Sequence, residues 1–285
     1  MSEPILDALE RALGQRPVKL RSLAGGCVGD VRCATMPDGS RVVVKSDESA
    51  APRLDVEGAM LRDLRERGGL PTPRVLHAAP SLLVMEFIEG SPGLSAGAQR
   101  HCAELLAALH GVRGDRFGYA YDTLIGGLAQ PNAPGDSWIE FFAERRLMHM
   151  ADEAHRAGRL GGRTLERVRR FAARLEEWID EPAHPSLLHG DAWSGNVLGA
   201  GDRVAAFIDP AIYHGHPEVE LAFMTMFGGF DRAFFDRYHE LRPIREGFFE
   251  TRREVYIAYP LLVHVRLFGG GYTGSLQATL HRFGC

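Results

Sequence analysis

LLHGDAWSGNVL, residues 187–198, is the most informative segment of this 285-residue chain. Asp191 and Asn196 lie within it, separated by four residues, and the apolar run that follows, VAAFI, ends directly before Asp209. Taken singly, an aspartate often caps a helix and an asparagine often occupies a turn. The three polar residues in one pattern indicate something more specific.

An Asp-x4-Asn loop followed by a short strand and a second aspartate is typical of kinases, where it carries the catalytic loop and a metal-binding carboxylate. Phosphoryl transfer needs a carboxylate beside the attacking hydroxyl, to orient it and accept its proton. It also needs amide and carboxylate oxygens to hold Mg²⁺, which prefers hard oxygen ligands. His189 begins the loop, as the histidine of the kinase HRD motif does. The pattern therefore predicts a kinase that uses Mg·ATP, with Asp191 at the centre of its chemistry.

Lys45, at the end of the β-branched run RVVVK, is the second informative residue. Of 33 basic residues only Lys19 and Lys45 are lysines, so arginine stands almost everywhere that a generic cation would do. Lys45 matches the strand lysine that contacts nucleotide phosphates in kinases, and Glu57, on the next predicted helix, is its expected partner. The alternative interpretation is a solvated strand end.

A glycine-rich stretch, LAGGCVGDV at residues 23–31, occupies the place of a phosphate-covering loop ahead of Lys45. Its glycines do not spell GxGxxG, and glycines also mark ordinary hairpin turns. Cys27 within this stretch is predicted to be the reactive thiol of the protein, because successive backbone N–H groups there favour a thiolate. An inert residue beneath the loop is the alternative for Cys27.

The order of the predicted elements suggests two lobes. An N-terminal helix and a hairpin ending at Lys45 come first. Further along the chain, the apolar patterns predict a strand over residues 82–88 and helices over 53–67, 98–110, 137–150 and 164–179. The connector EGSPG places the lobe boundary near residue 90, giving a nucleotide-binding lobe over 1–89 and a catalytic and acceptor-binding lobe over 90–285. The predicted class is α+β, with a small antiparallel sheet and one key helix preceding a larger, mainly helical lobe.

Composition narrows the class of protein further. The formal net charge is −4 and no run of five like charges occurs, which disfavours a nucleic-acid or anionic-membrane partner. The N-terminus lacks the basic start and apolar core of a signal peptide, and no apolar run approaches the roughly 20 residues of a membrane helix. The four cysteines form no CxxC pair, so neither a zinc site nor a disulfide framework is indicated, and a reducing cytoplasm is expected.

These motifs together resemble a known family. HGDxxxxN followed by an aspartate resembles the aminoglycoside phosphotransferase and choline kinase superfamily, within the protein-kinase-like fold. Three closer features resemble the fructosamine-3-kinase (ketosamine kinase) family: the glycine loop AGGCVG, LLHGDxWSGN with its Trp193, and DPAIYHGHPEVELAFMTMFGGF at residues 209–230. FGYAYDTLIG and SWIEFFAERRL also look like that family's insertion before the catalytic loop.

The resemblance implies ATP-dependent phosphorylation of the sugar 3-hydroxyl of ketosamines, either free or protein-bound. It also implies Asp191 as the catalytic base, with Asn196 and Asp209 as the Mg²⁺ ligands. Residues 85–88 would be the hinge whose backbone meets adenine. The residues that the resemblance assigns to nucleotide binding are Gly25, Gly26, Cys27, Lys45, Glu57, Met85, Glu86, Phe87 and Ile88.

The sequence says less about which residues bind the acceptor. Trp193 could stack on a sugar face or could anchor the loop by packing. His214 stands where the family commonly has a second tyrosine, and Glu220 where it has aspartate. His214 and His216 are expected to face the acceptor or pack the loop, and a zinc site is disfavoured. Two other functions stay open: a kinase for an aminoglycoside or another small hydroxyl compound, and a nucleotide-binding pseudokinase scaffold. Monomer and homodimer are both compatible with the sequence.

Overall fold

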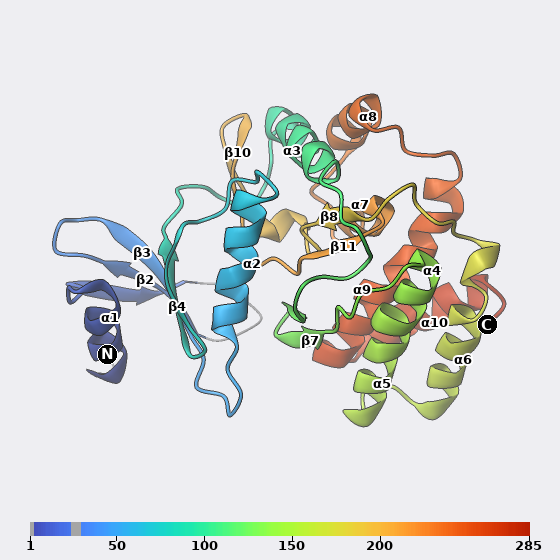
Figure 1. The fold of residues 1–285 in the computed structure, drawn as a ribbon, viewed down its shortest axis with the longest axis horizontal. Helices are drawn as coiled ribbons and strands as arrows, with labels where there is room; N and C mark the ends of the chain where they lie inside the picture. Colours follow the sequence, from blue (N-terminus) through green and yellow to red (C-terminus); the bar gives the residue numbers. More distant parts are fainter. Residues whose placement is uncertain (1–2, 24–29) are drawn as a thin grey trace.

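The structure, a computed structural model, describes residues 3–23 and 30–285. Its N-terminal part is an antiparallel five-stranded sheet with the strand order β1-β2-β3-β5-β4. The strands are β1 (Lys19–Ser22), β2 (Asp30–Thr35), β3 (Arg41–Ser46), β4 (Val75–Ala79) and β5 (Leu82–Glu86). Helix α1 (Glu3–Leu13) packs against one face of this sheet, and helix α2 (Leu54–Glu66) covers the other (Figure 1).

The alternation of side chains along β3 explains where Lys45 points. Val42 and Val44 belong to the apolar cluster on the α1 side of the sheet. Val43 packs against the cluster on the α2 side. Because successive side chains in a strand point to opposite faces, Lys45 lies on the same face as Val43, beneath α2.

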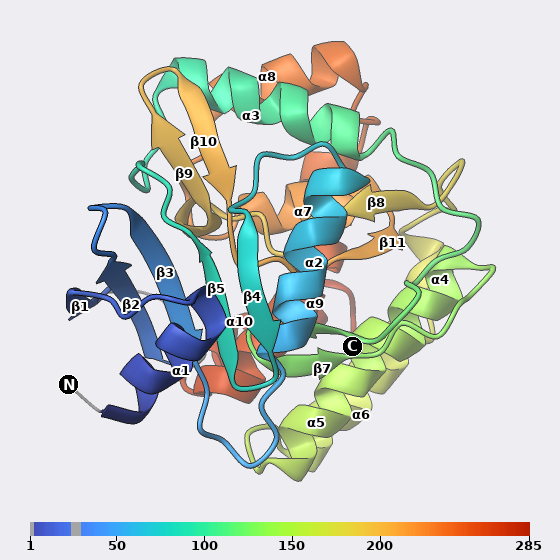
Figure 2. The same cartoon turned by 60° about the vertical axis from the view of Figure 1, so that its left-hand side comes forward.

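The rest of the chain is mainly helical. Its helices are α3 (Ala96–Leu109), α4 (Trp138–Phe141), α5 (His149–Arg156), α6 (Gly162–Ala172), α7 (Pro217–Met224), α8 (Arg232–Leu241), α9 (Arg253–Phe268) and α10 (Gly271–Arg282). Its short strands form three antiparallel pairs: β6 (Thr123–Ile125) with β7 (Leu128–Gln130), β8 (Ser186–Leu188) with β11 (Tyr213–Gly215), and β9 (Val197–Ala200) with β10 (Arg203–Phe207). Helices α3 and α8 lie side by side, and β10 packs against α3 (Figure 2). No helix among the described residues is long and apolar enough to cross a membrane.

Helix α2 is fastened to this helical part as well as to the sheet. The carboxylate of Asp63 accepts hydrogen bonds from the hydroxyls of Tyr119 and Tyr121, at 2.9 and 2.8 Å. At the other end of the helix, the Arg53 guanidinium donates to the backbone carbonyl of Asp122 at 3.2 Å. The helix is therefore held at both ends by the loop that precedes β6.

The α+β class is confirmed, but several predicted boundaries are not. The strand predicted over 82–88 ends at Glu86, where the connector begins. The helix predicted over 137–150 is part of a longer helical run that continues to Arg156. A π-helical segment, Phe142–Met148, lies in the middle of that run.

The helix predicted over 164–179 is wrong in its second half. Helix α6 ends at Ala172, and Leu175–Glu177 forms a separate 3-10 turn. The rings of Phe171 and Trp178 still stack, with centroids 5.1 Å apart. The apolar spacing thus continues past the end of the helix, which is why the periodicity suggested one unbroken element.

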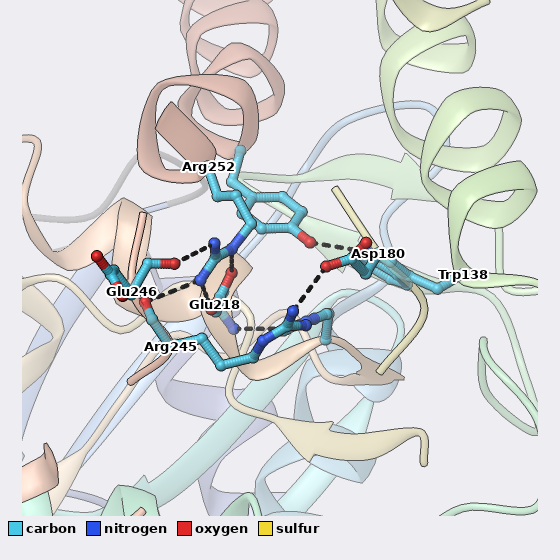
Figure 3. Close-up of polar contacts among 8 residues, drawn as sticks. Trp138, Asp180, Glu218, Arg245, Glu246 and Arg252 are labelled. Carbon is cyan, nitrogen blue, oxygen red and sulfur yellow. Dashed lines mark hydrogen bonds and ion pairs between the residues drawn. The ribbon is translucent and has the colours of Figure 1, made fainter. Parts of the chain in front are cut away.

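A buried ion pair supports the start of α7. Arg252 donates from Nε and Nη2 to the two carboxylate oxygens of Glu218, both at 2.7 Å (Figure 3). It also donates to the backbone carbonyls of Arg245 and Glu246, at 3.0 and 2.8 Å. The side chains of Arg252 and Glu218 are only 10% and 7% exposed, whereas the neighbouring pair of Arg245 with Asp180 is more than half exposed.

Replacing Arg252 by alanine is expected to lower the free energy of unfolding by about 3–5 kcal/mol, because Glu218 is left as a buried carboxylate without its ionic partner. The matched control is Arg245→Ala, which removes an exposed ion pair and should cost less than about 1 kcal/mol. Denaturant unfolding of the two variants checks the difference. Equal costs would contradict the role given to the buried pair.

Candidate active site

Lys45 lies between two carboxylates that come from distant parts of the chain. Its Nζ is 2.6 Å from Oε1 of Glu57 on α2, and 2.5 Å from Oδ1 of Asp209, which follows β10. Burial lowers the pKa of Lys45, but the charges and hydrogen bonds of these two carboxylates outweigh burial and hold the pKa above its ordinary value. The ammonium therefore stays charged, and it joins the sheet, α2 and the helical part at one point.

Asp191 begins the loop between β8 and β9. Its Oδ2 accepts a hydrogen bond from Nδ2 of Asn196 at 3.0 Å, and the same nitrogen donates to the Asp191 backbone carbonyl at 2.9 Å. Burial, together with the nearby charge of Asp209, raises the pKa of Asp191 well above its ordinary value. An ionised carboxylate with a raised pKa is a stronger proton acceptor than an ordinary surface aspartate.

Gly190 explains why the loop reads HGD. Its φ is 85°, and a Cβ at this position would overlap the backbone carbonyl oxygen of Ala211. Only glycine permits both this conformation and this close approach. The backbone N–H of Ala211 also donates to the carbonyl of His189 at 2.8 Å. The loop that carries Asp191 is thereby held directly against the segment that follows Asp209.

Asp209 and Asn196 place oxygen atoms beside Asp191. The backbone N–H of Ile208 donates to the Asn196 carbonyl at 3.0 Å, which fixes the two segments relative to each other. Asp209 has a φ of 52°, a left-handed conformation that is uncommon outside glycine and that clusters at functional sites. Because Nδ2 of Asn196 is engaged by Asp191, its Oδ1 is the atom left for a cation. An amide oxygen and a carboxylate fit the preference of Mg²⁺ for hard ligands.

Glu220 on α7 anchors the start of the catalytic loop. Its Oε1 accepts from the backbone N–H of Gly190 at 2.6 Å, and its Oε2 accepts from the backbone N–H of His189 at 3.2 Å. Oε2 also accepts from Nε2 of His110 at 2.8 Å, while Nδ1 of His110 lies 2.7 Å from the hydroxyl of Tyr238. Burial favours a raised pKa for Glu220, but these donors outweigh it and hold the pKa below its ordinary value. An ionised, fully buried acid thus fixes the backbone that leads into Asp191.

In the sequence, Glu220 stands out only as a departure from the family pattern, and no motif points to His110. A usable signal was present in the stretch PEVELAFM, in which Glu218 and Glu220 interrupt an otherwise apolar helix. Acids within a buried helix need charged or hydrogen-bonding partners. Their presence there predicts an anchoring role, although not the identity of the partners.

A cleft of about 420 Å³ brings these groups together. Its walls are the end of β3, the start of α2, the catalytic loop and the β6–β7 hairpin. The predicted site residues that line it are Lys45, Glu57, Asp191, Trp193, Asn196 and Asp209. The hairpin contributes Leu124, Gly126, Gly127 and Leu128, which sequence reasoning had not assigned to the site.

The predicted hinge residues lie outside this lining. Residues 85–88 run from the end of β5 into the connector, and they are not among the described residues that line the cleft. The Phe87 ring packs under the Arg41 guanidinium at 4.2 Å. A few residues on, Ser91 pairs with Gly199 of β9, so the connector joins the sheet to the β9–β10 hairpin. Gly25, Gly26 and Cys27 fall outside the described residues.

The structure does not bring the two predicted histidines to the cleft. The buried His214 ring stacks on Tyr119 with centroids 5.5 Å apart. His216 caps α7, since its Nδ1 accepts from the backbone N–H of Glu218 at 3.0 Å, and its ring packs near Tyr256. Burial, reinforced by nearby arginines, lowers the pKa of His216 to about 3, so the ring is neutral. Both side chains pack or cap structural elements and do not face Asp191.

Comparisons with known proteins give a consistent result. A family model described as fructosamine kinase matches residues 1–283. A probable ketoamine kinase from Synechocystis is 33% identical, over 98% of this chain and 95% of its own length, and the ketosamine-3-kinase of Mus musculus is 32% identical, over 94% and 96%. The crystal structure of a fructosamine-3-kinase homologue from Thermobifida fusca superposes with a TM-score of 0.86 at 31% identity, covering 97% of each chain.

Replacing Lys45 by arginine is expected to lower kcat/KM almost as much as replacing it by alanine, by about a hundredfold. The planar guanidinium is larger than an ammonium and cannot place one compact charge between two carboxylate oxygens at 2.5–2.6 Å. The matched control is Lys19→Arg on β1, the other lysine of the chain, which is exposed. Initial rates at varied ATP concentration check this. Near-normal rates for Lys45→Arg would show that a compact ammonium at this position is not needed for activity.

Replacing Glu220 by glutamine is expected to lower kcat about tenfold, because the neutral amide accepts more weakly from two backbone N–H groups and His110. ATP affinity should change little, since Glu220 does not line the cleft. Glu220→Asp keeps the charge and should retain more activity than the glutamine variant. Steady-state kinetics with an ATP-binding titration separate these effects. An unchanged kcat in Glu220→Gln would remove Glu220 from the positioning of Asp191.

Proposed function

The chain belongs to the fructosamine kinase family, and on this premise we propose that it transfers the terminal phosphoryl group of ATP to a sugar hydroxyl of a ketosamine. One observation carries the proposal. A single cleft holds a buried carboxylate with a raised pKa, two oxygen ligands for a cation, and an ammonium locked between carboxylates. This is the set of groups that phosphoryl transfer to a hydroxyl requires.

The nucleotide side of the proposal uses the sheet and α2. Lys45, positioned by Glu57, contacts the phosphates. Asn196 and Asp209 would hold Mg²⁺ through Oδ1 and a carboxylate oxygen, and when bound the ion neutralises phosphate charge. The hinge at residues 85–88 meets adenine, and the glycine stretch with Gly25, Gly26 and Cys27 covers the phosphates. In this proposal residues 1–89 are the nucleotide-binding lobe, and residues 90–285 form the catalytic and acceptor-binding lobe.

Asp191 acts on the acceptor. Its carboxylate orients the sugar hydroxyl toward the phosphoryl group and accepts the hydroxyl proton as the new P–O bond forms and the bond between the terminal phosphorus and ADP breaks. The hydrogen bond from Asn196 keeps one carboxylate oxygen in place, so that the other faces the acceptor. Trp193, in the lining of the same cleft, offers an aromatic face on which the sugar stacks.

The acceptor proposed here is a ketosamine phosphorylated at its 3-hydroxyl, following the name of the mouse relative. A protein-bound ketosamine is included, because plant relatives are named protein-ribulosamine 3-kinases. An aminoglycoside kinase is the second candidate of the same reaction class. It is less favoured, since the resemblance to the ketosamine kinases extends over almost the whole chain.

Asp191→Asn tests the proposal most directly. The variant should lose about a hundredfold or more in kcat, since asparagine cannot accept the proton, while it binds Mg·ATP nearly normally. Asp180→Asn is the matched control, because it neutralises an exposed aspartate that does not line the cleft and should leave kcat unchanged. ADP release is measured with a fructosyl-amino acid, a fructosyl-lysine peptide, a ribulosamine and an aminoglycoside. Wild-type turnover in Asp191→Asn would refute the catalytic assignment. ATP binding without turnover of any acceptor by the wild type would instead favour a scaffold.

A further inference from the structure

A row of aromatic rings leads out of the cleft on the side of Trp193. The Trp193 ring meets Phe227 edge to face, with centroids 5.5 Å apart. Phe227 in turn lies 5.1 Å from the ring of His264, on α9. His264 contacts Tyr272 at 4.8 Å and Phe268 at 5.6 Å. We call Phe227, His264, Phe268 and Tyr272 the aromatic ledge.

The opposite wall of the cleft rests on the same end of α9. Gly126, at the tip of the β6–β7 hairpin, lies so close to α9 that a Cβ there would be 2.9 Å from Cδ1 of Leu267. Leu267 directly precedes Phe268 of the ledge. Figure 1 shows this hairpin beside α9 and α10. Trp193 therefore contacts the aromatic ledge directly, and the hairpin contacts α9 at Leu267, the neighbour of Phe268 in the chain.

The side chains of the aromatic ledge are exposed, although burial of an aromatic ring lowers its free energy. Phe268 is 51% exposed and Phe227 39%, and Tyr272 and His264 are half-buried. Burial lowers the pKa of His264 and outweighs the opposite effect of the Pro260 carbonyl, which lies 2.7 Å from Nδ1, so the ring adds an aromatic face without a charge. Contiguous exposed aromatic side chains beside a binding cleft mark a surface that a ligand covers.

Beyond Phe227 and Tyr272 the ledge continues into an open groove between α9 and α10, of about 610 Å³. The residues that line it include the apolar Met226, Ile257 and Leu261 and the polar Arg253, Ser275 and Arg282. A chain that left the cleft past Trp193 would thus meet aromatic rings first and a groove with apolar and polar lining residues next.

The chemistry of the reaction places one part of the acceptor here. The sugar hydroxyl must reach Asp191, while Lys45 and the sheet side of the cleft hold the nucleotide. An acceptor held in this way can extend out of the cleft between Trp193 and the hairpin, the two parts of the lining that contact Phe227 and Leu267. In a ketosamine the part that extends is the substituent carried by the amine nitrogen. We infer that the aromatic ledge binds this substituent and makes the enzyme favour ketosamines whose nitrogen carries an aromatic or long apolar group, including the side chain and flanking peptide of a glycated protein.

This inference rests on the proposed function, so its test uses two ketosamines with the same sugar. One is the fructosyl derivative of methylamine, which is too short to reach the ledge, and the other is the fructosyl derivative of phenethylamine. The measured quantity is the selectivity, which is kcat/KM for the phenethylamine compound divided by that for the methylamine compound. Phe268→Ser should lower this selectivity about fivefold, and adding Tyr272→Ser should lower it further.

The matched control is Phe249→Ser. Phe249 is a 42% exposed phenylalanine that packs on Phe235 and Phe248, away from the ledge, and its removal should leave the selectivity unchanged. Unchanged selectivity in both ledge variants, with both compounds turned over, overturns the inference while the proposed function stands. A ledge variant that changes the sedimentation of the protein but not its selectivity also overturns it, because the ledge is then a surface between two copies. Wild-type enzyme that turns over neither compound refutes the proposed function itself.

Discussion

A buried ammonium that requires two carboxylates is the constraint on which the site depends. Lys45 is only 6% exposed, so its charge must be compensated by side chains rather than by water. Glu57 compensates it from α2 and Asp209 from the segment after β10. The sheet, the helix and the helical part can satisfy this ammonium only in one relative arrangement. That arrangement is also the one that places Asp209 beside Asn196 and Asp191.

Helix α7 also carries buried charged side chains that need specific partners. Glu218 and Glu220 lie close together on this helix but bind different partners. Glu218 pairs with Arg252 and fixes the helix in the fold, while Glu220 holds the backbone N–H groups of His189 and Gly190. One short helix thus contributes both to the stability of the fold and to the position of the loop that carries Asp191. A change that shifts α7 disturbs the catalytic loop even though no residue of α7 lines the cleft.

The contact between Lys45 and Glu57 could be anticipated from the sequence. Lys45 matches the strand lysine of kinases, and the helical pattern around Glu57 makes it the acid that faces inward, and the two side chains are 2.6 Å apart. The helix over 164–179 could not be bounded, because apolar spacing continued through a 3-10 turn. The anchor from Glu220 to His110 joins residues 110 positions apart, and no local pattern reveals such a partner. For His214 and His216 the sequence left two roles open, facing the acceptor or packing, and a local pattern cannot reveal a ring stack such as that of His214 on Tyr119.

The tyrosine contacts of α2 have a consequence for motion. Asp63 ties this helix to Tyr119 and Tyr121 in the helical part, while Glu57 on the same helix holds Lys45 of the sheet. A rotation of the sheet away from the helical part would have to break one of these attachments or the other. These two attachments therefore oppose a hinge motion between the sheet and the helical part. Ligands can enter or leave the cleft with both attachments intact only if the movements are small and local to the cleft walls.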